Sequence, residues 1–321
     1  MMVLPILLCF CSANLLPPDV RAVWDRAAHL SALGAHGSAD SLARIQTWAR
    51  KPEGLVLRAT LSLGAFADLH DPERMARADL LLQQAADVLD DDETSSGRYL
   101  AMLTLSQESF LASLQGSDFK AGLKGRKAAS IAQDLLDSHS DDPDVQGVAG
   151  GYLFWKAQAL GALRSAFGGD TREKGIAYTV RAAGSDSPLR EIWRTSLLWI
   201  HFERKEYPEA LKVVREGLVQ CPGNRSYHQA EGDILFRMGR LDDALDRYRT
   251  SWREYARIET IPVNRQAAAG NLARIHFAAG RKDSAMAWLD TLDATRYQAA
   301  RKWLPPSLVR ELKPVREALG K

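Results

Sequence analysis

The sequence predicts an all-α fold built from repeated helix pairs, and three observations support this prediction. Apolar residues recur at helical spacing along almost the whole chain, without a convincing run of alternating β-branched residues. Short segments rich in Gly, Pro, Asp and Ser separate helical stretches of roughly 12 to 18 residues. A related segment returns after 34 residues, a period typical of helical arrays.

The composition is that of an ordinary folded protein. Of the 321 residues, 46% are hydrophobic and 26% are charged, which excludes global disorder. The formal net charge of +2 provides no strong overall attraction to nucleic acid or to an anionic membrane. Basic residues exceed acidic ones in the part after Arg194, which favours an acidic partner there only weakly.

Residues 1–13 have two features of a secretory signal. An apolar stretch ends at Phe10 and is followed by the small residues 11–13, so cleavage after residue 13 would export the protein to the periplasm. The positive start of such a signal is missing, because no Lys or Arg precedes Arg21. The alternatives are a lipoprotein of the cell envelope anchored through Cys11, an uncleaved apolar helix, or a misassigned start.

Residues 14–141 are predicted to form a degenerate helical-repeat region. Helices are expected near residues 18–33, 39–49, 55–69, 73–89, 96–114 and 118–137. Two acidic clusters, Asp90–Glu93 and Asp141–Asp144, fall between expected helices and lack the alternating ligands and central glycine of a calcium-binding loop. We therefore expect both clusters to be solvated caps of helix N-termini.

Residues 142–293 carry the clearest repeats. Ala210 aligns with Ala244, 34 residues later, and Ala244 aligns with Ala285 after 41 residues, so one helix or loop is longer there. Gly175 occupies the same position 35 residues before Ala210. Three glycines interrupt a helical pattern further upstream, and close packing of backbones is the expected reason for them: Gly147, Gly150 and Gly151.

One copy combines small and large residues at the spacing of a tetratricopeptide repeat, namely Gly232, Gly239, Leu241, Ala244 and Tyr248. From about residue 171 to 292 the chain resembles that superfamily, and specifically its exported bacterial members. The resemblance implies an α-solenoid of antiparallel helix hairpins in a right-handed superhelix, with a concave groove. It implies no chemistry. Residues 294–321 are expected to form a capping helix over the last hairpin.

In this superfamily the groove is lined mainly by the first helix of each pair. Transferring those positions along the repeat alignment yields the candidate partner-binding residues Trp199, Phe202, Asp233, Phe236, Arg237, Arg274 and Phe277. A row of rings beside charged side chains would hold a peptide with apolar anchors and charged flanks. The alternative is that the three phenylalanine rings pack between adjacent hairpins. Of the residues that clamp a carboxylate in some family members, only Arg274 matches, so that ligand is not expected.

No catalytic or metal-binding motif occurs in the sequence. The seven histidines form neither HExxH nor a zinc spacing, and there is no nucleophile elbow or phosphate loop. We therefore expect a non-enzymatic scaffold or adaptor of the cell envelope that binds a protein or peptide partner, without cofactor, metal or nucleic acid. The alternative is a structural subunit of an envelope assembly, held to the membrane through a lipid on Cys11.

Overall fold

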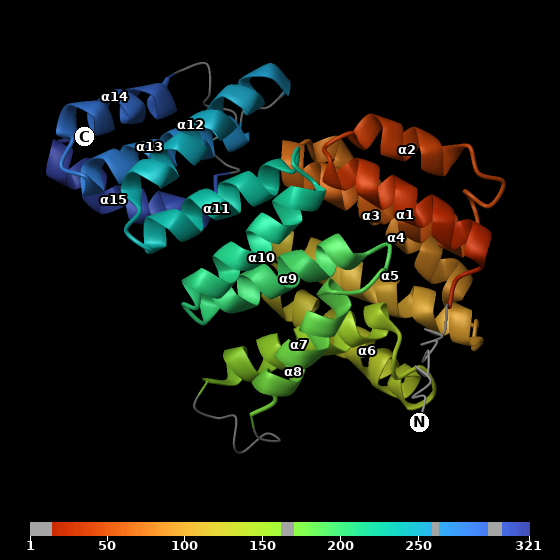
Figure 1. Cartoon of the computed structure of the whole chain (residues 1–321). Helices are drawn as coiled ribbons and strands as arrows, with labels where there is room; N and C mark the ends of the chain where they lie inside the picture. The colour runs from red at the N-terminus through yellow and green to blue at the C-terminus, as the bar shows by residue number, and fades with distance from the viewer. Residues whose placement is uncertain (1–14, 162–169, 259–262, 295–303) are drawn as a thin grey trace, which may run out of the picture.

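The computed structural model describes residues 15–161, 170–258, 263–294 and 304–321, and within these ranges the chain forms helices and turns without strands. The predicted signal segment, with Cys11, lies outside the described residues. The helices follow one another along the chain (Figure 1) as α1 (Pro18–Ala32), α2 (His36–Arg44), α3 (Pro52–Leu69), α4 (Pro72–Leu89), α5 (Ser95–Leu114), α6 (Asp118–Ser138), α7 (Pro143–Leu160), α8 (Arg172–Ala183), α9 (Arg190–Glu203), α10 (Tyr207–Gln220), α11 (Arg225–Arg237), α12 (Leu241–Ile258), α13 (Val263–Ala278), α14 (Lys282–Asp293) and α15 (Pro306–Leu319).

Consecutive helices pack against each other from α1 to α14, and α15 packs against α13, so the predicted all-α array of helix pairs is confirmed. One apolar core runs from Leu15 to Ile275 and crosses every pair from α1 to α13. A second, smaller core joins α13, α14 and α15. Burial of these shared faces, rather than the preference of any single helix for its conformation, holds the array together.

The close packing expected for the glycines of α7 is confirmed at Gly150. A Cβ atom at that position would lie 2.7 Å from the carbonyl oxygen of Gly175 on α8, which shows that the two backbones touch. Only glycine allows this approach, because any side chain would force the helices apart. At Gly151 the nearest atom to such a Cβ is 3.8 Å away, so this position tolerates a methyl group.

The second helix differs from its predicted bounds. It begins at His36 instead of residue 39 and ends at Arg44 instead of residue 49. The early start brings the buried His36 ring within 2.8 Å of the Asp68 carboxylate. Arg58 donates a hydrogen bond of 3.1 Å to the Ala49 carbonyl oxygen, which holds the segment after Arg44 in turns instead of a helix.

The C-terminal end of α3 meets helices that lie far along the chain, namely α11, α12 and α13 (Figure 1). Asp68, in the last turn of α3, is the centre of this contact. Its carboxylate accepts hydrogen bonds from Arg225 Nε on α11 and from the Tyr255 hydroxyl on α12, each 3.0 Å long. At the neighbouring junction, Asp25 on α1 pairs with Arg190 on α9 at 3.3 Å. The array therefore closes into an arc in which α1 and α3 brace helices between α9 and α13.

Candidate partner-binding groove

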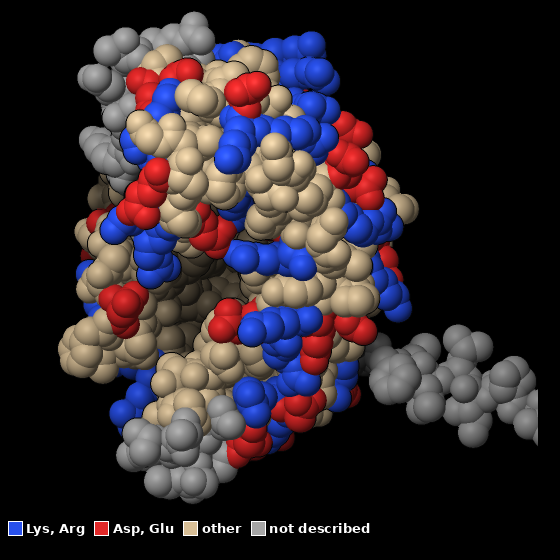
Figure 2. Space-filling view, turned by 90° about the vertical axis from the view of Figure 1, so that its left-hand side faces the viewer, with Lys and Arg blue, Asp and Glu red and all other residues tan. Residues whose placement is uncertain are grey.

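Five of the seven predicted groove residues line one cavity of about 230 Å³, framed by α9, α11, α13 and α15. These five are Trp199, Phe202, Asp233, Arg237 and Arg274. Figure 2 shows one face of the molecule hollowed, with uncharged residues in its depth and charged residues of both signs around it. The remaining lining residues of the cavity are Gln229, Tyr248, Asn264, Ala267, Ala268, Asn271, Pro305, Ser307, Leu308 and Glu311.

The apolar side of the cavity is formed by two rings of α9. Trp199 is 40% exposed and lies edge-to-face against Phe202, with 5.3 Å between the ring centroids. Phe202 in turn meets the Tyr207 ring at 5.6 Å and packs against the main core. Trp199 is therefore a large apolar surface that is supported from behind and open to a ligand, which is the usual character of an aromatic anchor site.

Phe236 and Phe277 are not among the lining residues of the cavity. Phe236 is half-buried against the main core, beneath the Arg274 guanidinium, whose carbon lies 4.3 Å from the ring centroid. Phe277 packs against the second core, between α13 and its neighbours. For these two rings, packing between hairpins is the observed arrangement, and the aromatic row does not form one continuous surface.

The charged side of the cavity is centred on Arg274. This side chain is only 9% exposed and pairs with Asp233 at 3.2 Å as well as with the Glu311 carboxylate of α15. Arg237, on α11, donates to the other Glu311 oxygen at 2.5 Å. Two guanidinium groups thus converge on one carboxylate, one of them buried above an aromatic ring. Such charge-assisted bonds are stronger than neutral ones, particularly where water is partly excluded.

The floor of the cavity depends on small residues. A Cβ atom at Gly232 would lie 2.8 Å from the Tyr248 ring, which fills the space between α11 and α12. Burial, and then the neighbouring Asp233 carboxylate, raise the pKa of the Tyr248 phenol well above its usual range, so that it stays neutral. The repeat residues Gly232 and Tyr248, which identified the motif in the sequence, therefore also position the groove wall.

Four polar lining residues were missed in the sequence: Asn264, Asn271, Ser307 and Glu311. Asn264 and Asn271 belong to α13, where the longer interval between repeats weakens the alignment. Glu311 was placed in a capping helix, and its sequence position contains no signal that it reaches α11. Its neighbours Leu308 and Leu312 do form an apolar pair at helical spacing.

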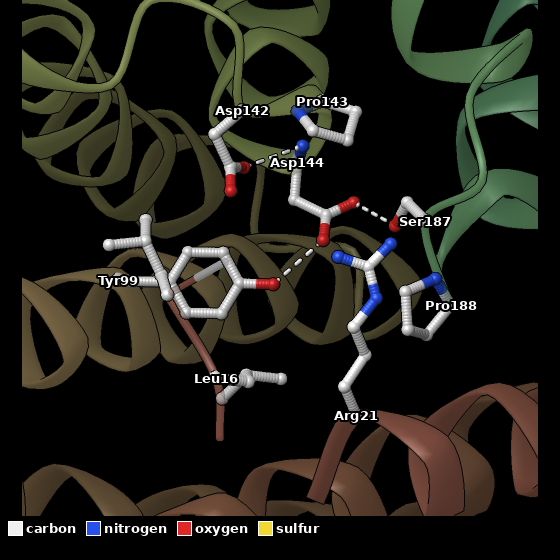
Figure 3. A pocket seen from close by; sticks show the side chains of 9 residues that line it. Leu16, Arg21, Tyr99, Asp142, Pro143, Asp144, Ser187 and Pro188 are labelled. Atoms are coloured by element: carbon white, nitrogen blue, oxygen red, sulfur yellow. Dashed lines mark hydrogen bonds between the residues drawn. The ribbon is translucent and has the colours of Figure 1, made fainter. Parts of the chain in front are cut away.

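A second pocket surrounds the acidic pair Asp142 and Asp144 (Figure 3). Asp142 accepts hydrogen bonds from the backbone N–H of Asp144 at 2.9 Å and Val145 at 3.0 Å, and so caps α7 as expected. The expectation that this cluster is solvated holds for the exposed Asp141 but is wrong for Asp142 and Asp144, which are 6% and 4% exposed. Leu15 and Leu16, which precede α1, help to line the pocket around the two carboxylates.

The Asp144 carboxylate is fully engaged within the protein. It accepts hydrogen bonds from the Tyr99 hydroxyl at 2.7 Å, the Ser187 hydroxyl at 2.5 Å and the Trp193 indole N–H at 2.6 Å. Burial raises the pKa of both acids, that of Asp142 to about 7. The space beside them is about 20 Å³, enough for one water molecule. We interpret this cluster as a structural joint between α5, α7 and α9.

Within the described residues, no three His, Cys, Asp or Glu side chains are placed to hold a metal ion. None of the described helices combines the length and the apolar character needed to cross a membrane.

Comparison with known proteins shows what the chain is similar to. The family model for the tetratricopeptide repeat matches residues 235–303. Among solved structures, PilF of Pseudomonas aeruginosa is 15% identical, with a TM-score of 0.41, over 78% of this chain and 98% of that one. A tetratricopeptide repeat protein from Parabacteroides merdae is 12% identical, with a TM-score of 0.41, over 92% of this chain and all of that one. No curated protein sequence matches the chain.

Proposed function

Because the chain carries tetratricopeptide repeats, with the family match at residues 235–303, we propose that it is a non-catalytic scaffold that docks a protein or peptide partner in its concave groove. The observation that carries this proposal is the cavity between α9, α11 and α13, where the exposed Trp199 faces a pair of arginines. An apolar anchor beside fixed charge is the combination that peptide-binding sites use for affinity and for orientation.

The size of the cavity supports a peptide ligand. Sites for drug-sized molecules enclose about 300–1,000 Å³, whereas this cavity measures about 230 Å³. It accommodates one or two side chains of a partner, with the rest of the partner lying along the groove. We propose that an apolar side chain packs on Trp199 while a carboxylate of the partner binds at Arg274 and Arg237.

Photo-crosslinking in cells tests the groove directly. A photoreactive amino acid replaces Asn271, which lines the cavity, and a matched control carries it at Lys212 on α10, where the side chain is 78% exposed. We expect a distinct adduct from position 271 that is absent from position 212 and is lost when Trp199→Ala is added. Identical adducts from both positions, unaffected by Trp199→Ala, would remove the groove from consideration.

The cellular location is a separate proposal that rests on residues 1–13. We propose export and cleavage after residue 13, with the lipid-anchored envelope subunit as the alternative. Fractionation combined with N-terminal sequencing of the mature chain tests cleavage. Metabolic labelling with a fatty acid tests the anchor, with Cys11→Ser as the matched control. A label that depends on Cys11 favours the alternative, whereas an unlabelled mature chain starting at residue 14 supports export in soluble form.

A further inference from the structure

The C-terminal helix α15 lies on the groove side of α13. Its residues Leu308 and Leu312 are buried, and both approach Gly270 so closely that a Cβ atom there would lie 3.2 and 3.1 Å from them. Gly270 lies on α13 one helical turn before Arg274, which lines the cavity. The apolar face of α15 therefore covers part of the surface on which a groove ligand would rest, and Leu308 itself lines the cavity.

The polar contacts of α15 reach beyond the last hairpin. A helix that only capped the array would contact α13 and α14, the pair that precedes it. Glu311 instead bridges Arg274 on α13 and Arg237 on α11, and so spans two repeats. The protein's own carboxylate thus occupies the point where the two arginines converge, while Leu308 borders the space in front of Trp199.

Several features of α15 would allow a partner helix to replace it. Pro314 lies inside it, and proline in a helix interior removes one backbone hydrogen bond and costs roughly 3 kcal/mol. The helix exposes Val309 to solvent, and at its far end Arg316 pairs with Asp293 at 2.7 Å, a contact outside the cavity. A partner helix without proline would make the same contacts from a more stable conformation.

We propose that α15 is an internal occupant of the groove and that the partner is an amphipathic helix that replaces it and brings a carboxylate to the position of Glu311. This inference rests on the proposed groove function and adds the chemistry of the partner. The partner places one carboxylate between Arg274 and Arg237, with apolar side chains three residues before it and one residue after it, as Leu308 and Leu312 are placed about Glu311. Both apolar side chains lie against Gly270, and the first also borders the cavity that Trp199 lines.

The test compares the full-length protein with Glu311→Gln and with the matched control Glu317→Gln. Glu317 lies on the same helix but is 65% exposed and pairs with the exposed Lys313 at 3.9 Å. The probe is a fluorescent synthetic peptide of residues 305–321 with Pro314→Ala, added in trans and followed by anisotropy. Asp233 still pairs with Arg274 in the Glu311→Gln protein, so the fold is retained. Circular dichroism checks this directly.

We expect the peptide to bind Glu311→Gln roughly tenfold more tightly than the wild type, because the internal competitor has lost a charge-assisted bond. Glu317→Gln is expected to bind like the wild type. A peptide whose own glutamate at the 311 position is changed to glutamine should lose roughly tenfold in affinity. Amide hydrogen exchange in α15 is expected to accelerate in Glu311→Gln alone.

Equal affinity of the wild type and Glu311→Gln overturns the inference, as does absence of binding to Glu311→Gln. Equal binding of the two peptides would show that the carboxylate does not matter and would also overturn it. These outcomes are independent of the crosslinking test, because a groove that captures its partner from position 271 can do so without competition from α15.

Discussion

Replacement of Asp68 by asparagine is expected to destabilise the closed arc by about 3 kcal/mol. Asp68 is 6% exposed, and its carboxylate joins α3 to α2, α11 and α12 through His36, Arg225 and Tyr255. Asparagine preserves the shape and leaves one acceptor oxygen, but it removes the negative charge that faces Arg225. The change therefore isolates the electrostatic part of the contact that α3 makes with α11 and α12.

The magnitude follows from burial. The Arg225 side chain is 15% exposed, so the guanidinium would remain in a poorly solvated position without its partner. Breaking a buried ion pair by removing one member costs about 3–5 kcal/mol. A retained hydrogen bond to the Tyr255 hydroxyl is worth about 1 kcal/mol, which places the loss at the lower end of that range.

The pH dependence provides an internal check on Asp68. Burial opposes ionisation, but hydrogen bonds from His36 and Arg225 outweigh it and lower the pKa of Asp68 in the folded protein. A lowered folded-state pKa means that the stabilisation is present above the unfolded value and is lost as the pH falls through the folded one. The wild type and Asp68→Asn should therefore converge in stability in strong acid.

Urea unfolding at neutral pH, followed by near-ultraviolet circular dichroism, measures the loss, and amide hydrogen exchange in α11 to α13 locates it. The matched control is Asp25→Asn, because Asp25 also joins the N-terminal to the C-terminal helices but is 49% exposed. An exposed pair of this kind contributes at most about 1 kcal/mol. If Asp68→Asn costs no more than Asp25→Asn, the reasoning from burial is refuted.

Three further outcomes follow from individual contacts. Gly150→Ala is expected to lower the free energy of unfolding by about 1–3 kcal/mol in urea, because the added methyl group meets the Gly175 carbonyl. The control Gly151→Ala should be neutral or stabilising by up to about 1 kcal/mol. Equal effects of the two substitutions would contradict the packing argument. Burial raises the pKa of Asp142 to about 7, so below that pH the folded protein binds a proton that the unfolded chain does not. The free energy of unfolding of the wild type should therefore fall by up to about 2 kcal/mol between pH 5.5 and 8. Asp142→Asn should not show this decrease. Burial also raises the pKa of the Cys221 thiol to about 11. Iodoacetamide at pH 8 should therefore modify Cys221 in the native protein at least about 100-fold more slowly than in urea, as measured by peptide mass spectrometry.

The fold was predictable from the sequence because its determinants are local and periodic. The repeat from Ala210 to Ala244, the turns and the spacing of apolar residues led to the all-α array, which is confirmed, and to the tetratricopeptide repeat, whose family model matches residues 235–303. The bounds of α2 were not predictable in the same way. They depend on His36 and Ala49, whose partners Asp68 and Arg58 lie in the next helix, and a tertiary contact overrides the local preference.

The groove was predictable only where it follows the repeat. Trp199, Asp233 and Arg274 line one cavity because equivalent positions of stacked helices face the same side. The partner of Arg274 on α15 lies outside the repeat, and no periodicity connects Glu311 to α11. The burial of Asp144 was also hidden, because it depends on residues as distant in sequence as Tyr99 and Ser187.

Closure of the chain on itself bears directly on binding in the groove. In an open repeat array each unit contacts only its neighbours, so small rotations between repeats accumulate along the groove. Here Asn264, which lines the cavity, also donates a hydrogen bond to the backbone carbonyl of Asp68, so the N-terminal helices hold the first turn of α13. Since α13 carries Arg274 while Trp199 belongs to α9, this contact fixes the separation of the charged and apolar sides of the site. Because the site is ordered before the ligand binds, binding does not carry the entropic cost of ordering the site. Asp68→Asn keeps the carbonyl that Asn264 contacts but weakens the hold of α3 on α11 through Arg225, so it should reduce crosslinking from position 271 without altering any side chain that lines the groove.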